Sequence, residues 1–248
     1  MTPADGTREW HAIVPAAGEG TRLRPLTADR PKPLVEVAGQ PLLAHVFDAL
    51  APSDPASFVV VIGYRGEQVR EHFGDSFGGV PIEYVCQPEQ VGLADAVGRA
   101  GAVVDGPAIV CNGDNVFATD LEPLAAAHEA AEEDPVATML VEDASIETAR
   151  ETGVVVTDDR GHVECVVEKP DAPPSTLVSA GAIAVEPAIF EAIDAIEPAD
   201  TGEYELADAL TWLIERGETV NTHRFEGERV NVNTPADVER AEAMTEER

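Results

Sequence analysis

The sequence predicts an α/β fold of the Rossmann-like, doubly wound type, with three αβα layers and a mixed, mainly parallel central sheet. Three observations support this prediction. Short apolar segments alternate with amphipathic ones from residue 10 to about 140, as in chains built from βα units. Some segments, such as 58–62, are apolar throughout and suit strands covered on both faces. Glycines and polar residues follow these segments, where open α/β sheets bind ligands.

Expected strands and helices alternate along the first part of the chain. A proline stands at the start of the expected helix 41–50, where its missing N–H costs nothing. Gly74 ends the expected helix 67–73. We expect strands at 10–15, 58–62, 82–86, 108–111 and 136–141. We expect further helices at 93–100 and 121–132.

The pattern changes after residue 145. Two apolar segments, 154–157 and 163–167, flank an Asp-Asp-Arg-Gly turn and predict a β-hairpin. Residues 203–216 carry leucines at helical spacing and predict a long amphipathic helix. The remaining expected elements are strands at 182–185, 220–225 and 230–232 and helices at 187–196 and 236–247. Without a linker or repeat, we expect one domain over 1–248, with halves at about 10–140 and 141–248.

The charge of the chain limits its partners. Among 248 residues, 47 are acidic and 16 are basic, which gives a net charge of −31. This charge argues against nucleic acid and anionic membranes as partners. The chain has neither a membrane-spanning apolar run nor an apolar signal segment at its start. We expect a soluble, cytoplasmic protein, and a homo-oligomer is possible.

The acidic residues are spread along the chain, and alanines are many. This composition resembles that of proteins from salt-accumulating haloarchaea, where a Debye length of about 3 Å screens self-repulsion. We therefore expect a higher melting temperature in about 2 M than in about 0.1 M KCl. Thermal unfolding at the two concentrations tests this. Equal or higher stability at low salt would contradict the halophilic interpretation without bearing on the function.

Lysine and cysteine are rare in this chain. Lysine occurs only at Lys32 and Lys169, each followed by proline, so each is expected to have a specific task. The cysteines are Cys86, Cys111 and Cys165. Their wide spacing argues against a zinc site and a disulfide framework. We expect each to be a small buried side chain in a strand.

A glycine-containing segment with nearby cations follows the first expected strand. Gly18 and Gly20 lack a Cβ, so backbone N–H groups can approach an anion closely. Thr21 adds a hydroxyl, and Arg22 adds a guanidinium that fits two phosphate oxygens. Lys32 stands between two prolines downstream. We interpret this segment as a polyphosphate site, with a plain strand-to-helix turn as the alternative.

The spacing matches neither of two common phosphate motifs. A Walker A loop needs Gly-Lys-Ser/Thr, whereas Gly20-Thr21-Arg22 stands here. A dinucleotide fingerprint needs a glycine where Leu23 stands. A hydride-transferring Rossmann enzyme is therefore disfavoured.

Polar residues also follow two later strands. Gln87 can donate and accept at the edge of a base, and Gly92 allows a helix to begin close to a flat ring. Asp114 lies in Asn-Gly-Asp-Asn after the strand 108–111, where a carboxylate beside a phosphate site can hold Mg²⁺. Ordinary turns are the alternative for both segments.

The motif Gly18-x-Gly20-Thr21-Arg22-Leu23-x-Pro25-Leu26-Thr27, with Pro31-Lys32-Pro33-Leu34, resembles the opening motif of the sugar-phosphate nucleotidylyltransferases. The resemblance covers nearly all of residues 10–240, with its motifs in the family's order. It implies a fold of the nucleotide-diphospho-sugar transferase type, with a nucleotide-binding first half and a sugar-binding second half. It also implies Mg²⁺-dependent transfer of a nucleotidyl group from UTP or dTTP to a sugar 1-phosphate, most often glucose 1-phosphate, with release of pyrophosphate.

The resemblance assigns roles to individual residues. Arg22 would hold the leaving phosphates, and Lys32 would neutralise charge on the α-phosphate. The implied nucleotide-binding residues are Ala16, Ala17, Gly18, Gly20, Thr21, Gln87 and Gly92. The implied contacts to the sugar phosphate come from Gly153, Glu168 and Lys169. The implied Mg²⁺ ligands are Asp114 and Asn231.

The chain departs from the family at Asn231-Val232-Asn233-Thr234-Pro235, where many relatives have Asp-Val-Gly-Thr-Pro. The family's Asp is the second metal ligand. An amide oxygen can bind Mg²⁺ but brings no formal charge. The N-acetylglucosamine-1-phosphate uridylyltransferases are similar in having Asn there. A catalytically weak regulatory protein that binds nucleotide or sugar is the alternative function.

Overall fold

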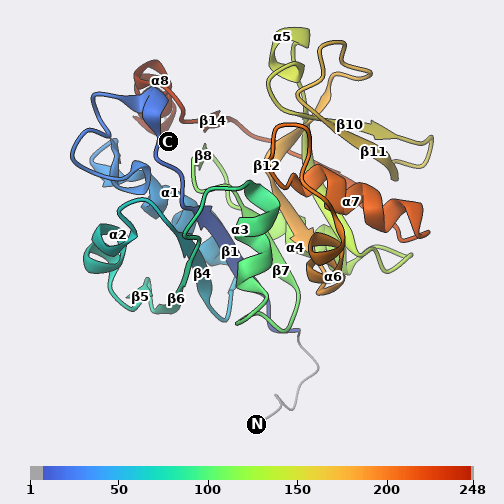
Figure 1. Cartoon of the computed structure of the whole chain (residues 1–248), viewed down its shortest axis with the longest axis horizontal. Helices are drawn as coiled ribbons and strands as arrows, with labels where there is room; N and C mark the ends of the chain where they lie inside the picture. The colour runs from blue at the N-terminus through green and yellow to red at the C-terminus, as the bar shows by residue number, and fades with distance from the viewer. Residues whose placement is uncertain (1–7, 247–248) are drawn as a thin grey trace.

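Strand β1 (His11–Ala16) lies near the middle of the main sheet in the computed structural model, which describes residues 8–246 (Figure 1). It is flanked by two parallel strands, β4 (Phe58–Ile62) and β7 (Ala108–Cys111). Strand β6 (Val80–Cys86) lies parallel beside β4 and carries the short edge strand β5 (Ser76–Phe77). These four longer strands form the parallel part of the sheet.

The second part of the sheet is mainly antiparallel. Strand β12 (Leu177–Val185) runs antiparallel to β7 and to β9 (Ala137–Asp143). Strand β13 (Val220–Arg224) lies parallel beside β9. Strands β10 (Gly153–Thr157) and β11 (Val163–Glu168) form a hairpin, and β10 pairs antiparallel with β12. Within the described residues, the main sheet has ten strands. The expected mixed, mainly parallel sheet is confirmed.

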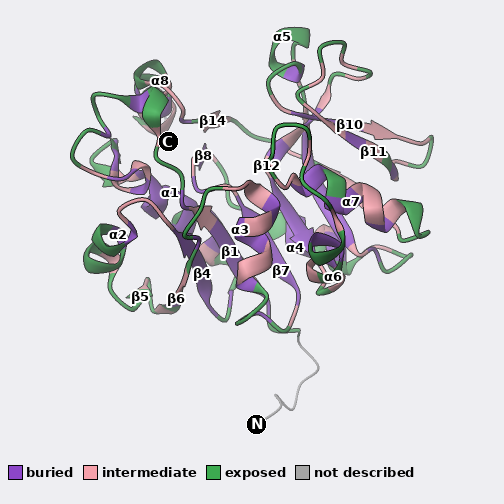
Figure 2. Ribbon diagram, viewed as in Figure 1, coloured by how far each residue is buried: buried purple, intermediate pink, exposed green. Residues whose placement is uncertain are grey.

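Helices cover both faces of this sheet, because its strands are apolar on both sides (Figure 2). One face packs against α3 (Leu93–Ala100), α6 (Ala188–Ala195) and α7 (Leu206–Glu215). The other face packs against α1 (Leu42–Leu50), α2 (Gly66–Phe73) and α4 (Glu122–Glu129). The three-layer arrangement is therefore as expected.

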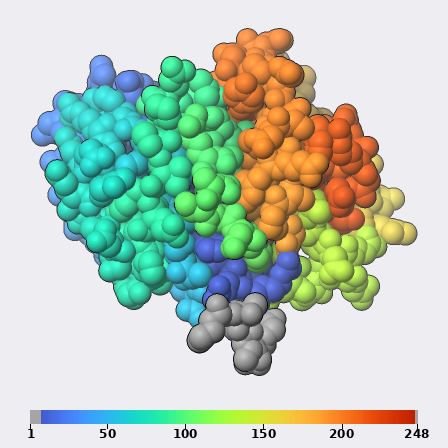
Figure 3. All heavy atoms as spheres, turned by 60° about the horizontal axis from the view of Figure 1, so that its bottom comes forward, coloured from blue at the N-terminus to red at the C-terminus, as the bar shows by residue number. Residues whose placement is uncertain are grey.

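Helices α3 and α6 lie side by side on the outer surface (Figure 3). A Cβ added at Gly98 would lie 2.8 Å from Ile193, and one added at Gly101 would lie 3.0 Å from Phe190. The two glycines therefore permit this close helix contact. The contact joins an element of the first half to one of the second, although the division into two functional halves stays a prediction.

Helices α4 and α7 differ most in length from the expectation. Helix α4 ends at Glu129, before the expected end at residue 132; the chain then turns, and Ala131 N donates to His128 O at 3.4 Å. Helix α7 begins at Leu206, because the backbone of Tyr204 forms hydrogen bonds with the segment before and at the start of α3. The N–H of Tyr204 donates to Val91 O (2.7 Å), and the carbonyl of Tyr204 accepts from Ala94 N (3.0 Å). Tertiary hydrogen bonds therefore replace the first expected turn of the helix.

A small second sheet was not expected from the sequence. Strand β8 (Asn115–Phe117) follows β7 after a turn and pairs antiparallel with β14 (Arg229–Asn231). The last helix, α8 (Pro235–Glu246), follows β14. The expected helix also included residue 247, and the expected domain included both chain ends; these positions lie outside the described residues. Further short elements are β2 (Glu36–Val37), β3 (Gln40–Pro41), α5 (Ile146–Ala149) and single 3-10 turns at Thr21–Leu23, Lys32–Leu34 and Ala51–Ser53.

The expectation of three buried cysteines is only partly right. Cys111 is buried, and burial raises the pKa of its thiol. Cys86 is exposed, because it stands at the end of β6, and Cys165 is half-buried in the hairpin. None of the helices within residues 8–246 has the length and apolar character needed to cross a membrane.

Candidate active site

The loop after β1, residues 17–22, is called the phosphate loop below, after the role that the sequence predicts for it. Within residues 8–246, the backbone N–H groups of 18–22 donate no hydrogen bond, which leaves them free for an anion. Gly20 has φ of 64°, and a Cβ there would lie 2.9 Å from Lys32 Cβ. The Thr27 hydroxyl donates to Gly20 O at 2.9 Å. Gly20 therefore shapes the loop and makes room for Lys32.

A cavity of about 230 Å³ opens beside this loop. Its lining comes from the end of β1, the phosphate loop, the Lys32 turn, the start of α3 and the turn after β7. A Cβ added at Gly18 would meet no atom within 4 Å. Packing within the protein therefore leaves room for a side chain at position 18. A ligand that approaches the backbone closely at this position would, in contrast, require glycine.

Gly113 brings Asp114 to this cavity. Its N–H donates to Pro15 O (3.2 Å), and a Cβ there would lie 2.6 Å from the same oxygen. Lys32 Nζ donates to Asp114 Oδ2 at 2.8 Å, with 13% and 25% of the two side chains exposed. A cation and a carboxylate from distant segments thus meet at the wall of the cavity.

The second sheet places Asn231 beside Asp114. Asn231 pairs with Asn115 in the β8–β14 register, and Val232 N donates to Asp114 O at 2.8 Å. The structure therefore brings together the two residues that the resemblance implies as metal ligands, although they are far apart in the sequence.

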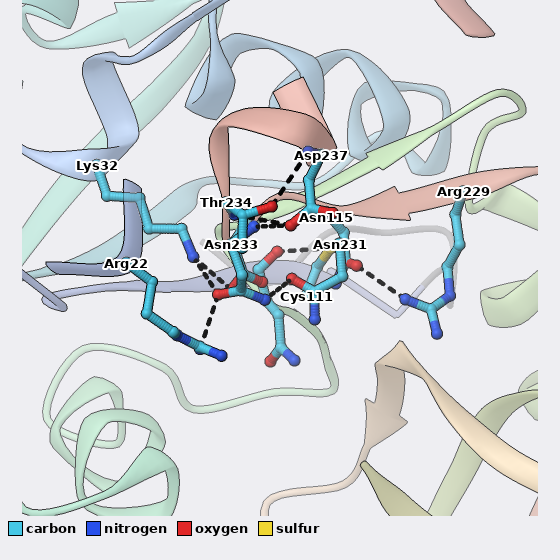
Figure 4. A network of polar contacts seen from close by, with 11 residues as sticks. Arg22, Lys32, Cys111, Asn115, Arg229, Asn231, Asn233, Thr234 and Asp237 are labelled. Carbon is cyan, nitrogen blue, oxygen red and sulfur yellow. Dashed lines mark hydrogen bonds and ion pairs between the residues drawn. The ribbon is translucent and has the colours of Figure 1, made fainter. Parts of the chain in front are cut away.

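Asn233 is a central residue that sequence reasoning missed (Figure 4). Its Oδ1 accepts from Lys32 Nζ (2.9 Å) and Arg22 Nη2 (3.1 Å). Its Nδ2 donates to Asn231 Oδ1 (2.8 Å). The sequence did offer one signal for it: Asn231 and Asn233 are two residues apart at the end of an expected strand, and in extended chain such residues point to the same side. Arg22, Lys32, Asp114, Asn231 and Asn233 form what is called the central polar cluster below.

Asn233 is itself held by the start of α8. Its backbone N–H and that of Thr234 donate to Asp237 Oδ2, at 2.9 Å and 2.7 Å. These bonds outweigh the effect of burial and lower the pKa of Asp237. Asp237 therefore stays ionised and fixes the segment that presents the two amides.

Arg229 supports the same strand pair from the side away from Lys32 (Figure 4). Its guanidinium donates to Asn115 Oδ1 (3.0 Å) and to Glu142 Oε1 (2.6 Å). Only 10% of its side chain is exposed. Since Glu142 belongs to β9, this ion pair ties the small sheet to the main sheet.

Gln87 directly follows β6, next to the phosphate loop, and Gly92 directly precedes α3. A Cβ at Gly63 would lie 2.8 Å from Ala17 Cβ and 3.0 Å from Gln87 O, so only a glycine separates the two segments. Gly92 has φ of 116°, and a Cβ there would lie 2.4 Å from Tyr204 O. The backbone of Tyr204 thus leaves no room for a side chain at position 92. This contact within the protein is enough to require glycine there, whether or not a nucleotide base also lies nearby.

Gly153, Glu168 and Lys169 gather at the end of the hairpin. Gly153 pairs with Glu168, and a Cβ on the glycine would lie 3.1 Å from Glu168 Oε2. Lys169 has φ of 42°, and its Nζ donates to Glu168 Oε1 at 3.0 Å. Within the described part of the chain, no hydrogen bond or ion pair joins this group to the central polar cluster.

Carboxylates dominate the surroundings of Lys169. Burial lowers the pKa of Lys169, but Glu168, Glu205 and Glu203 outweigh it, so the pKa is raised. Burial and the charge of Glu168 raise the pKa of Glu205 and of Asp208. Lys169 therefore stays protonated at neutral pH, as a ligand for an anionic group must.

The nucleotidyl transferase family model matches residues 11–243, which contain all of these groups. The chain belongs to this family. It is 41% identical over 236 residues to the UTP–glucose-1-phosphate uridylyltransferase AglF of Haloferax volcanii, with 95% of this chain and 96% of that protein covered. It is 34% identical to a low-salt glycan biosynthesis nucleotidyltransferase of the same organism, of which it spans 63%.

Solved structures agree with this nucleotidyl transferase fold. A UDP-glucose pyrophosphorylase in complex with UDP-glucose superposes with a TM-score of 0.86 at 21% identity, over 98% of this chain and 100% of that one. The resemblance, the fold type and the enzyme class predicted from the sequence are thereby confirmed. The roles of the individual site residues stay predictions.

The donor set of this nucleotidyl transferase suits Mg²⁺. Within residues 8–246, no group of three or more His, Cys, Asp or Glu side chains could hold a metal. Mg²⁺, however, is usually bound by one or two protein oxygens together with water and substrate phosphates. Asp114 supplies one such oxygen in the lining of the cavity, because Lys32 occupies only Oδ2 of the carboxylate. Asn231, on the neighbouring strand, supplies a second oxygen, which accepts one hydrogen bond from Asn233 and has a further lone pair. The residues present therefore fit this ion.

Proposed function

We propose that this nucleotidyl transferase transfers the uridylyl group of UTP to glucose 1-phosphate, giving UDP-glucose and pyrophosphate. The observation that carries the proposal is the central polar cluster, in which two cations, a carboxylate and two amides meet beside a loop with free N–H groups. The 41% identity to a uridylyltransferase of this specificity supports the choice of substrates.

The proposed reaction is a single in-line displacement. An oxygen of the sugar phosphate forms a bond to the α-phosphorus of the triphosphate, and the bond from that phosphorus to the bridging oxygen breaks. The electron pair leaves with pyrophosphate. Because the nucleophile is already an anion, no side chain has to remove a proton from it. Catalysis consists mainly of positioning and charge stabilisation.

The residues of the chain divide these tasks. Arg22 binds the leaving phosphates, and Lys32 neutralises charge that grows on the α-phosphate and the bridging oxygen. Lys169 holds the phosphate of the sugar, and Glu168 contacts its hydroxyls. Asp114 and Asn231 would hold Mg²⁺, which neutralises phosphate charge when bound. With a net charge of −31 on the chain, these cations let two anionic substrates approach.

A panel of nucleoside triphosphates against a panel of sugar 1-phosphates, read by pyrophosphate release with Mg²⁺ in molar KCl, tests the proposal. UTP with glucose 1-phosphate is expected to give the highest kcat/KM. Pyrophosphate release from no pair would favour the regulatory alternative, and preference for another pair would correct the substrates. A cytoplasmic location and independence from nucleic acid and membranes belong to the same proposal.

Asn233→Ala is expected to lower kcat by about tenfold or more, because hydrogen bonds to charged groups are worth about 1.5–3 kcal/mol. The variant leaves Lys32 and Arg22 without their common acceptor and Asn231 without its donor. Steady-state pyrophosphate release measures the effect. Asn221→Ala, a partly buried asparagine on β13, is the matched control. An unchanged kcat in folded Asn233→Ala would show that Asn233 does not position the two cations.

A further inference from the structure

Gln87 is a buried polar side chain, with 4% of the residue exposed. Its Nε2 donates to Gly92 O at 3.1 Å and to Asp95 Oδ2 at 2.8 Å. A backbone carbonyl and an ionised carboxylate can only accept hydrogen bonds. The NH₂ of the Gln87 amide must therefore face these two oxygens, because a flipped amide would set three acceptors against one another.

Asp95 is in turn fixed by Arg99, one turn along α3. Arg99 Nε donates to Asp95 Oδ2 (2.8 Å), and Nη2 donates to Oδ1 (3.0 Å). Burial raises the pKa of Asp95, but the bonds from Arg99 and Gln87 outweigh it and leave the pKa lowered. Asp95 is therefore an anionic acceptor throughout the neutral range, and its orientation is held by a two-bond contact.

The side-chain carbonyl oxygen of Gln87, Oε1, accepts no hydrogen bond from any donor within residues 8–246. Gln87 lies beside the phosphate loop, since Gly63 separates it from Ala17, and Gln90 Nε2 donates to Ala17 O at 3.0 Å. A nucleotide whose phosphates occupy this loop would bring its base to this end of β6.

We propose that Asp95, backed by Arg99, is a positioning residue that selects the base by fixing the Gln87 amide with its oxygen available to the ligand. Uracil and thymine present an N3–H donor to that oxygen. Cytosine presents an unprotonated N3 at the same place, so two acceptors would face each other in a partly desolvated site. The inference rests on the proposed function and deepens it from nucleotidyl transfer to the class of base accepted.

The selection does not extend to the methyl group that separates thymine from uracil, because both bases carry the same N3–H. We expect the wild type to prefer UTP over CTP by about 10²-fold or more in kcat/KM, since a site built around a hydrogen bond rejects a base that cannot make it. We expect UTP and dTTP to be separated by other contacts, not by Asp95.

The variant Asp95→Asn tests the proposal. An asparagine lacks the charge of Asp95 and one of the two acceptor oxygens that Asp95 offers to Gln87 and Arg99. The Gln87 amide is then held less firmly in one orientation and can rotate to offer a donor to cytosine. The ratio of kcat/KM for UTP over that for CTP, with the same sugar 1-phosphate, is expected to fall about tenfold. Asp194→Asn, an exposed aspartate on α6, is the matched control and should leave the ratio unchanged.

Arg99→Lys is the second variant, because it keeps the carboxylate of Asp95 and removes only the two-bond fork. It should lower the same ratio by a smaller factor. Equal losses with UTP and CTP in both variants would show a structural role and overturn the proposal, as would an unchanged ratio in folded Asp95→Asn. Wild-type inactivity with every triphosphate would instead contradict the proposed function, so the two failures are distinguishable.

Discussion

Lys32→Ala is expected to lower kcat by about 10²-fold or more, because a group that stabilises charge in the transition state typically supplies roughly 3 kcal/mol. Only 13% of the Lys32 side chain is exposed, so water cannot replace its charge easily. The measurement is steady-state pyrophosphate release at saturating substrates, together with a melting curve that shows whether the variant is folded.

Arg30→Ala is the matched control, because it also removes one positive charge close to Lys32 in the chain. Arg30 is more exposed, at 42% of its side chain, and it contacts Asp29 and Glu36 instead of the central polar cluster. Its removal should leave kcat nearly unchanged. Near-normal turnover in folded Lys32→Ala would remove Lys32 from the proposed catalytic residues.

Asp114→Asn is expected to abolish most activity at ordinary Mg²⁺ concentrations. Of the two proposed ligands, Asp114 supplies the only formal charge. The exchange keeps the size of the side chain and leaves intact the backbone bond from Val232 N to Asp114 O. The rate measured against Mg²⁺ concentration, in parallel with the melting temperature, separates loss of the ion from loss of the fold.

Two exchanges at Asn231 should move the Mg²⁺ requirement in opposite directions. Asn231→Asp adds a charged oxygen and should lower the Mg²⁺ concentration that gives half-maximal rate. Asn231→Ala removes a ligand oxygen and should raise it. If Asn231 were only a turn residue, both variants would lose stability, and their Mg²⁺ curves would match that of the wild type.

Much of the fold could be predicted from local patterns. Strands β4 and β7 and helix α3 were predicted with their observed limits, because an apolar run or a helical period is complete within each segment. The hairpin of β10 and β11 was predicted because its turn residues are contiguous; Asp158 Oδ1 accepts from the backbone N–H of Arg160 and His162.

Contiguous motifs and periods within single elements were enough to predict the family, the fold type and a phosphate-binding role for the loop after β1. Which residues meet depends on the tertiary structure. The β8–β14 pair sets Asn231 beside Asp114, and Asn233 then joins Lys32 to Asn231. Such contacts depend on the register between segments far apart in the chain. That register is set by packing in three dimensions, of which a single sequence carries no local signal.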